Sequence, residues 1–223
     1  MAAICFDMYG TLCNTGVVVD TLVEELEVSE ALVTQLDTSW RTKQLEYTFQ
    51  LGLMDEYEPF WQVTRDALDF TLARYDLDPD NETRLRIMAG YEALSPFPGA
   101  IDTLAELQDA GHTVAVLSNG NPAMLESLAD EAGLSNHLDA IISADEVETY
   151  KPAAAVYENA AARLDTPIED CWLVSTNAWD VTGAGNAGMQ TCWVNRIHDP
   201  HERIGPGVDA VVPDVPGVLA EVP

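Results

Sequence analysis

Four groups of polar residues stand at or beyond the ends of apolar runs in this sequence. The groups are Asp7 with Thr11, Ser118 with Asn119, Lys151 alone, and Ser175 with Asn177 and Asp180. A carboxylate can supply a nucleophilic oxygen, and an ammonium group can stabilise its ionised form. Hydroxyl and amide groups can hold that carboxylate or bind an anion. No histidine lies among these positions, so a Ser-His-Asp mechanism is not expected.

Each group has an ordinary structural interpretation when it is taken alone. Asp7 could begin a turn, Ser118-Asn119-Gly120 could form one, and Asn177 could cap a helix with Asp180 in its first turn. The groups share one structural position, however, because each follows an expected strand. The loops after parallel strands converge on one crevice of an open α/β sheet. Together, the groups therefore indicate a ligand site.

In such a site Asp7 is the candidate nucleophile. Lys151 would stabilise the ionised form of Asp7 and lower its pKa, and Asp180 could hold Lys151 or position a water molecule. Side-chain hydrogen bonds to the nucleophile or to a bound anion would come from Thr11, Ser118, Ser175 and Asn177. Backbone N–H groups at strand ends could bind an anion as well.

The order of the expected elements predicts the fold class. After about residue 95, buried strands alternate with helices; the strands are expected at 113–117, 140–143, 171–174, 190–194 and 210–212, and the helices include 122–131, 151–163 and 181–187. This alternation predicts an α/β fold with a doubly wound parallel sheet. Residues 14–94 are predicted to be helical, with Ser29 capping a long helix and a shorter helix at 81–91. We expect a Rossmann-like core at 1–13 and 95–223 and an inserted helical unit at 14–94.

The composition is strongly acidic. Asp and Glu number 38 against 10 Lys and Arg, a formal net charge of -28. Such a surface repels nucleic acid and anionic membranes, so neither is an expected partner. Acidity spread along the chain, with only Lys43 and Lys151 as lysines, is typical of cytoplasmic proteins of salt-accumulating microbes. A lysine kept in such a chain has a specific task, unless both remain by chance.

The sequence gives no signal for membrane insertion or secretion. No apolar run reaches about 18 residues, so no membrane-spanning helix is expected. The N-terminus lacks the basic and apolar segments of a signal peptide. The cysteines lack the spacing of a metal site, which favours reduced, mostly buried thiols in a cytoplasmic enzyme; they are Cys5, Cys13, Cys171 and Cys192.

The four polar groups together resemble the four motifs of the haloacid dehalogenase superfamily, and residues 14–94 fall where that family inserts its helical cap. The resemblance is narrower still, to the L-2-haloacid dehalogenases. Tyr9 occupies the position where superfamily phosphatases carry a second Asp that protonates the leaving group. The last motif has the Ser-x-Asn-x-x-Asp form of the dehalogenases, and the segment 40–47 (WRTKQLEY) is similar to theirs.

The resemblance implies a hydrolytic dehalogenation of short (S)-2-haloalkanoic acids to (R)-2-hydroxy acids. Asp7 would displace the halide from C2 and form an ester, which water then hydrolyses. Lys151, Asn177 and Asp180 would hold the nucleophile and the water. The resemblance further implies that Ser118 binds the substrate carboxylate, that Arg41 and Asn119 receive the halide, and that an apolar pocket is formed by Tyr9, Leu45, Phe60 and Trp179. It implies no metal and no other cofactor, and a homodimer is common in the family.

Two other functions compete with this one. In a Mg²⁺-dependent phosphatase acting on a small phosphorylated metabolite, Asp7 and Asp180 would bind the metal as hard oxygen ligands. Tyr9 counts against it, because the general acid is missing. An acidic binding module could also keep the fold without turnover. For individual residues, Arg41 could lie on a solvated helix face, and the four apolar pocket residues could be ordinary core.

Overall fold

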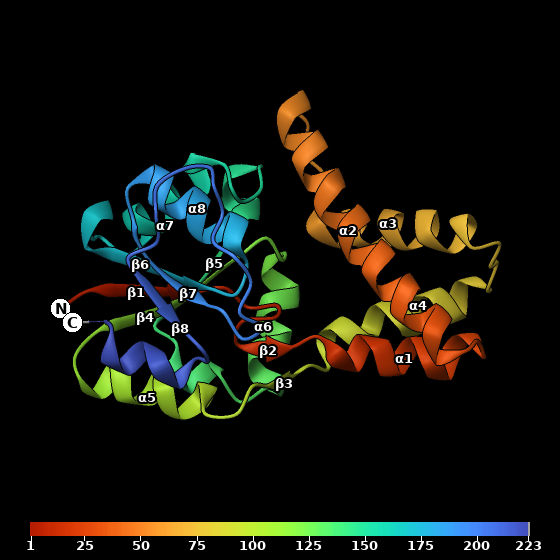
Figure 1. Ribbon diagram of the computed structural model, residues 1–223, viewed down its shortest axis with the longest axis horizontal. Coiled ribbons are helices and arrows are strands. Elements are labelled where there is room, and N and C mark those ends of the chain that lie inside the picture. Colours follow the sequence, from red (N-terminus) through yellow and green to blue (C-terminus); the bar gives the residue numbers. More distant parts are fainter. Residues whose placement is uncertain (223) are drawn as a thin grey trace.

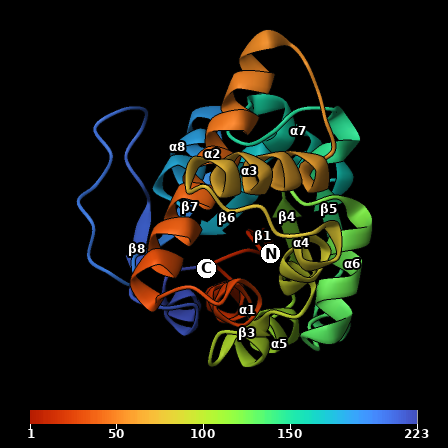
Figure 2. The same ribbon diagram turned by 90° about the vertical axis from the view of Figure 1, so that its right-hand side faces the viewer.

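The computed structural model describes residues 1–222, which form a sheet flanked by helices and a separate group of helices beside it (Figure 1). Seen from the side of that helical group, its helices lie in front of the sheet (Figure 2). The N-terminus and the last described residues lie at the opposite end of the molecule (Figure 1). The predicted fold class, a parallel α/β sheet with an inserted helical cap, is confirmed.

The sheet has six parallel strands in the order β5-β4-β1-β6-β7-β8. Their bounds are Ala3–Phe6 (β1), Thr113–Ser118 (β4), Ala140–Ser143 (β5), Cys171–Ser175 (β6), Gln190–Val194 (β7) and Ala210–Val212 (β8). From β1 the chain builds outward to β4 and β5 on one side and to β6, β7 and β8 on the other. The carboxyl end of β1 is therefore the point where the strand order reverses, and a ligand crevice is expected there.

Alternating side chains of β1 enter different hydrophobic layers, as the two-residue period of a strand requires. Ile4 and Phe6 pack in the layer that contains residues of α5 (Ala100–Asp109) and α6 (Pro122–Glu131). Ala3 and Cys5 pack in the layer that contains residues of α7 (Ala154–Arg163) and α8 (Ala178–Ala187). Burial on both faces explains why the strands are continuous apolar runs in the sequence. Short 3-10 turns lie at Ser135–His137, Ala144–Val147, Ile168–Asp170 and Pro216–Ala220.

The cap consists of four helices between two short strands. Its helices are α1 (Gly16–Leu26), α2 (Glu30–Met54), α3 (Phe60–Arg74) and α4 (Asn81–Ala89), followed by a 3-10 turn at Gly90–Glu92. The strands that lead out of and back into the core, β2 (Cys13–Asn14) and β3 (Ser95–Pro96), pair antiparallel. Ser29 is confirmed as the N-cap residue of α2, since its hydroxyl accepts a hydrogen bond from the Leu32 backbone N–H.

Three predicted helix boundaries were wrong. The helix expected from residue 151 begins at Ala154, because the Lys151 N–H donates to the Asn119 side chain (2.8 Å) and the segment before the helix is a turn. The helix expected from residue 181 begins at Ala178. The helix expected to reach residue 91 ends at Ala89 and tightens into the 3-10 turn.

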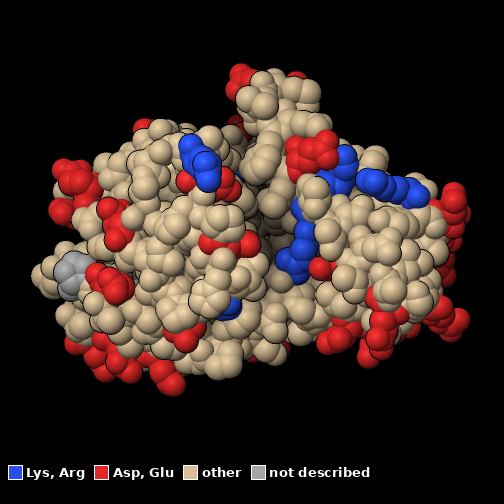
Figure 3. All heavy atoms as spheres, in the orientation of Figure 1, with Lys and Arg blue, Asp and Glu red and all other residues tan. Residues whose placement is uncertain are grey.

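The surface and the cysteines agree with the sequence analysis. Acidic side chains are spread over both the core and the cap on the face shown in Figure 3. All four cysteines are buried free thiols, as predicted. Among residues 1–222, no helix combines the length and the apolar character that crossing a membrane requires.

Candidate active site

A cavity of about 180 Å³ opens between the carboxyl ends of the strands and the cap. Ten of the thirteen predicted site residues line it: Asp7, Tyr9, Arg41, Leu45, Phe60, Ser118, Asn119, Lys151, Asn177 and Trp179. The remaining three, Thr11, Ser175 and Asp180, are fully buried behind the lining and contact residues in it. The structure thus brings the predicted set together around one small space.

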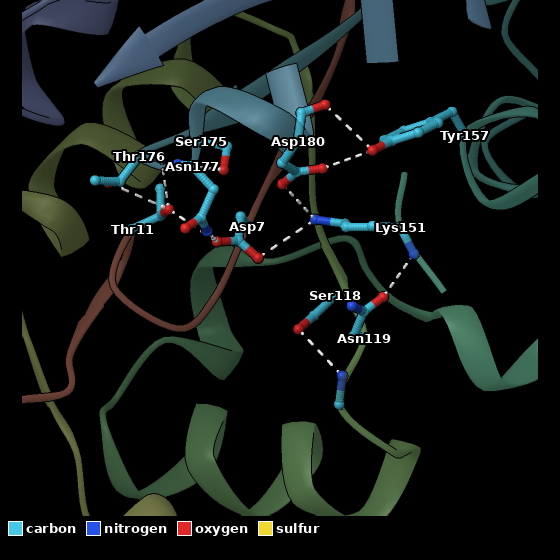
Figure 4. Close-up of polar contacts among 11 residues, drawn as sticks. Asp7, Thr11, Ser118, Asn119, Lys151, Tyr157, Ser175, Thr176, Asn177 and Asp180 are labelled. Atoms are coloured by element: carbon cyan, nitrogen blue, oxygen red, sulfur yellow. Dashed lines mark hydrogen bonds and ion pairs between the residues drawn. The ribbon is translucent and has the colours of Figure 1, made fainter. Parts of the chain in front are cut away.

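Asp7 lies at the base of this cavity, where the backbone leaves β1. It is 6% exposed. Its Oδ2 accepts hydrogen bonds from the Thr11 hydroxyl (3.0 Å) and the Asn177 amide (3.0 Å), and its Oδ1 lies 3.3 Å from the Lys151 ammonium (Figure 4). Asn177 sits at the N-cap position of α8, yet its side chain makes no capping hydrogen bond. Its amide is committed to Asp7 instead.

Lys151 bridges two carboxylates. Its Nζ lies 2.9 Å from Asp180 Oδ2 as well as 3.3 Å from Asp7 Oδ1, and its side chain is 1% exposed. The other oxygen of Asp180, Oδ1, accepts a hydrogen bond from the Tyr157 hydroxyl (2.8 Å). The Lys151 ammonium thus contacts both carboxyl groups, and it can stabilise the ionised form of Asp7 that nucleophilic attack requires.

Burial shifts the ionisation of this cluster. Burial raises the pKa of Asp7, and the Asp180 carboxylate adds to that shift, while the Lys151 ammonium and the Thr11 hydroxyl oppose it. The sequence analysis expected a lowered pKa for Asp7; the effect of Lys151 has the expected sign, but loss of water around the carboxylate outweighs it. Burial by itself would lower the pKa of Lys151, yet Asp180 and Asp7 raise it, so the ammonium stays charged.

Polar residues around the cluster fix the turns that carry it. The Ser175 hydroxyl accepts from the Asn177 amide N–H (3.1 Å), and the Ser118 hydroxyl accepts from Gly120 N–H (3.3 Å). Asn119 accepts the Lys151 N–H, as described above. Ser118 and Asn119 also border the cavity, at the end of β4.

The cap supplies the opposite wall, through Arg41 and Leu45 of α2 and Phe60 of α3. Arg41 borders the cavity while its side chain remains 33% exposed; its Nε donates to Asp37 Oδ1 (3.0 Å) and its Nη2 to the Thr15 carbonyl (3.2 Å). These two contacts do not use Nη1. Phe60 stacks on Tyr9 with ring centroids 6.5 Å apart.

Sequence reasoning missed several residues of the site. Tyr157 holds Asp180, and Gln44 and Tyr91 complete the cavity lining. Tyr157 and Tyr91 have the pattern of ordinary buried aromatic residues on helices, so only their spatial position distinguishes them. Burial and the adjacent Asp180 carboxylate raise the pKa of Tyr157, which keeps its hydroxyl protonated and able to donate.

Arg196, also missed, supports the nucleophile loop from behind. Its Nη1 donates to the Gly10 carbonyl (2.8 Å) and the Thr176 hydroxyl (2.8 Å), and its Nη2 to the Thr11 carbonyl (2.9 Å). Its guanidinium stacks on the Phe97 ring at 3.8 Å. Thr176 N–H donates in turn to the Thr11 hydroxyl (3.0 Å), the group that donates to Asp7.

The cluster does not suit a Mg²⁺ site of the phosphatase kind. Both oxygens of Asp180 are engaged, one by Lys151 and one by Tyr157. The ammonium of Lys151 therefore lies between the two carboxylates that would share the metal. Within residues 1–222, no cluster of three or more His, Cys, Asp or Glu side chains is arranged to hold a metal ion.

The family model for haloacid dehalogenase-like hydrolases matches residues 1–188 of this chain. (S)-2-haloacid dehalogenase 1 of Pseudomonas sp. (strain CBS-3) is 40% identical over 200 residues, which cover 90% of this chain and 87% of that protein. The chain belongs to the L-2-haloacid dehalogenase family. The resemblance carried by the four motifs is thereby confirmed.

Solved structures of L-2-haloacid dehalogenases have the same fold. One aligns with a TM-score of 0.95 at 34% identity and covers 100% of this chain and 98% of its own. Another, from Xanthobacter autotrophicus with chloropropionic acid covalently bound, aligns with a TM-score of 0.90 at 32% identity and covers 98% and 96% of the two chains.

Proposed function

We propose that this protein hydrolyses short (S)-2-haloalkanoic acids to (R)-2-hydroxy acids through an ester on Asp7. The observation that carries the proposal is the buried Asp7 carboxylate, which faces a small cavity and is held by Lys151, Thr11 and Asn177. Family membership supports the same reaction. The matching position for a phosphatase's general acid holds Tyr9, and the engaged oxygens of Asp180 disfavour a metal-dependent phosphatase.

In the first step, an oxygen of Asp7 forms a bond to C2 while the carbon–halogen bond breaks. The halide leaves with the bonding electrons on the side opposite Asp7, so the configuration inverts from S to R. The cap lies on that side, and we assign halide stabilisation to the Arg41 guanidinium and the Asn119 amide. Arg keeps its charge in a site with little water. Ser118 and neighbouring backbone N–H groups would hold the substrate carboxylate.

In the second step, water attacks the carbonyl carbon of the ester. The bond between that carbon and the substrate's oxygen breaks, which releases the hydroxy acid and restores the Asp7 carboxylate. We assign the water to Lys151, Asn177 and Asp180. Asp180 accepts a proton from the attacking water and returns it to the departing substrate oxygen, and the carboxylic acid of Asp7 then loses its proton to solvent. Tyr157 and Lys151 fix Asp180 for this role through hydrogen bonds of 2.8 Å and 2.9 Å.

A single turnover in H₂¹⁸O tests the covalent route. With enzyme in excess over (S)-2-chloropropionate, the product should carry the original oxygen of Asp7, and the peptide containing Asp7 should gain one ¹⁸O. Asp7→Asn should abolish chloride release while leaving the far-UV spectrum unchanged. If ¹⁸O enters the product in the first turnover, water attacks C2 directly and the ester mechanism is wrong. Unchanged chloride release in the presence of EDTA would separate this enzyme from the phosphatase alternative.

We also propose that the enzyme works in the cytoplasm, since its four thiols are free, and that it assembles as a homodimer. The exposed apolar side chains of Leu53 and Met54 at the end of α2 support an association between copies. Light scattering during size-exclusion chromatography would measure the mass in solution. A monomer at micromolar concentration would contradict the proposed dimer, and the proposed reaction would be unaffected.

A further inference from the structure

The strand order, together with the substrate binding proposed above, indicates where the alkyl group of a bound 2-haloacid would point. Asp7 follows the central strand β1, with Ser118 at the end of β4 on one side and Asn177 beyond the end of β6 on the other (Figure 4). In the proposed reaction the substrate carboxylate lies at Ser118 and the halide lies toward the cap. The alkyl group on C2 is then directed to the β6 side, where Trp179 forms the wall.

A second hollow begins on the far side of Trp179. It measures about 410 Å³, against about 180 Å³ for the active-site cavity. Its lining includes Trp179 itself, together with Phe49, Pro152 and Ile204. Trp179 thus borders both the catalytic cavity and this outer groove, and it is the residue that the two linings share.

Phe49 closes the same position from the cap. It lies one helical turn after Leu45 on α2, so the two side chains share a face of the helix, and Leu45 borders the active-site cavity. The rings of Phe49 and Trp179 meet edge to face with centroids 5.6 Å apart. Phe49 is 37% exposed, so its ring is not enclosed by packing on every side. This ring contact is one of several between cap and core; hydrogen bonds of Tyr57 to Asp145 and of Trp61 N–H to Asn121 are others.

We propose that Phe49 and Trp179 form a gate that sets the chain length of the substrate, and that the outer groove receives the alkyl tail of longer 2-haloacids when the gate is open. The inference rests on the proposed function. An aliphatic tail suits this groove, because Phe49, Pro152, Trp179 and Ile204 offer it apolar surface. When the rings of Phe49 and Trp179 are in contact, the gate is closed and the substrate is confined to the small inner cavity.

The test compares (S)-2-chlorohexanoate with (S)-2-chloropropionate as substrates, using kcat/KM for chloride release. Phe49→Ala should raise the ratio of the long to the short substrate by at least about tenfold, since each methylene that a pocket accepts or rejects is typically worth that much. Phe49→Trp should lower the ratio. Phe70→Ala is the matched control: Phe70 is also on a cap helix and 39% exposed, but it packs on Tyr47, away from the cavity. The ratio of kcat/KM for the long and the short substrate should be the same in Phe70→Ala as in the wild type.

The outcomes separate the gate from the reaction. If the wild type releases chloride from the short acid and Phe49→Ala leaves the ratio unchanged, the gate is overturned and the proposed function stands. An equal change of the ratio in Phe70→Ala would also overturn it, because the effect would then not depend on contact with Trp179. If the wild type releases no chloride from either acid, the proposed function fails and the gate falls with it.

Discussion

Replacing Lys151 with Met removes the cation between Asp7 and Asp180 and keeps a side chain of similar length. In the native structure the ammonium lies 3.3 Å and 2.9 Å from the two carboxylates, and the side chain is 1% exposed. Removing one partner of a buried ion pair typically costs about 3–5 kcal/mol. For a domain of this size, each kcal/mol moves the Tm by about 2–4 °C. We therefore expect Lys151→Met to lower the Tm by roughly 6–20 °C near neutral pH and to abolish turnover.

The loss should depend on pH. Burial raises the pKa of Asp7, and without the ammonium that opposes this shift the Asp7 carboxyl group should bind its proton still more tightly in the folded state than in the unfolded chain. Below the carboxyl pKa of the unfolded chain, about 4, both states are protonated and the variant loses least. As the pH rises, the unfolded state loses its proton at about pH 4, while the folded state keeps its proton until its own, higher pKa is reached. Between these two pH values the free energy of unfolding falls as the pH rises. The Tm difference from the wild type should therefore grow from about pH 4 to about pH 7.

Thermal unfolding followed by circular dichroism at several pH values measures both effects. Lys43→Met is the matched control, because Lys43 is the other lysine of the chain. Its ammonium pairs with Glu46 and lies 4.3 Å from the centroid of the Phe70 ring, outside the cluster of Asp7 and Asp180. That variant should retain turnover and show no Tm difference that grows with pH. If Lys151→Met melts with the wild type at neutral pH, or if its Tm difference is constant across the range, the reasoning from the buried cluster is refuted.

Three further outcomes are expected. Arg41→Ala removes the donor that we propose for the leaving halide, a loss of about 3 kcal/mol, so single-turnover halide release should slow roughly 100-fold while ester hydrolysis slows much less. Native halide release with stalled hydrolysis would contradict this role. Because burial raises the pKa of Asp7 and the ionised form attacks, kcat/KM should fall on acidification at a pH above the ordinary carboxyl value of about 3.9, and an acid limb at or below that value would count against it. Salt screens the repulsion among 38 acidic residues, so the Tm should rise toward molar KCl, and a Tm independent of KCl would exclude this effect.

The sequence predicted those parts of the fold whose signals are local. Helix α6, at Pro122–Glu131, and strand β5, at Ala140–Ser143, have the predicted bounds, since a proline opens the helix and the strand is a short apolar run. The start of α7 could not be placed, because it depends on the hydrogen bond between Lys151 N–H and Asn119, residues 32 positions apart.

The same distinction applies to the site. Asp7, Ser118 and Asn177 could be proposed from the sequence because they follow apolar strands, and the sheet's topology gathers such positions. Tyr157 and Arg196 could not. Tyr157 is an aromatic residue inside a helix, and Arg196 lies beyond β7, so their roles depend on the packing of segments distant in the chain. The four-residue spacing of Arg41 and Leu45 places both on one side of their helix, but the role of Arg41 in the site was reached only through resemblance to the family.

The two connections between core and cap, residues 11–14 and 95–97, are held to each other and to the core. Strands β2 and β3 pair with each other, Phe97 N–H donates to the Leu12 carbonyl (2.8 Å), and Arg196 holds the Thr11 carbonyl while it stacks on Phe97. Because these contacts hold both connections to the core, a change in the cap beyond residues 14 and 95 would leave the donors of Asp7 in place. If a cap from another protein were joined at Asn14 and Ser95, the pairing of β2 with β3 would be kept, and the position of Asp7 should not change.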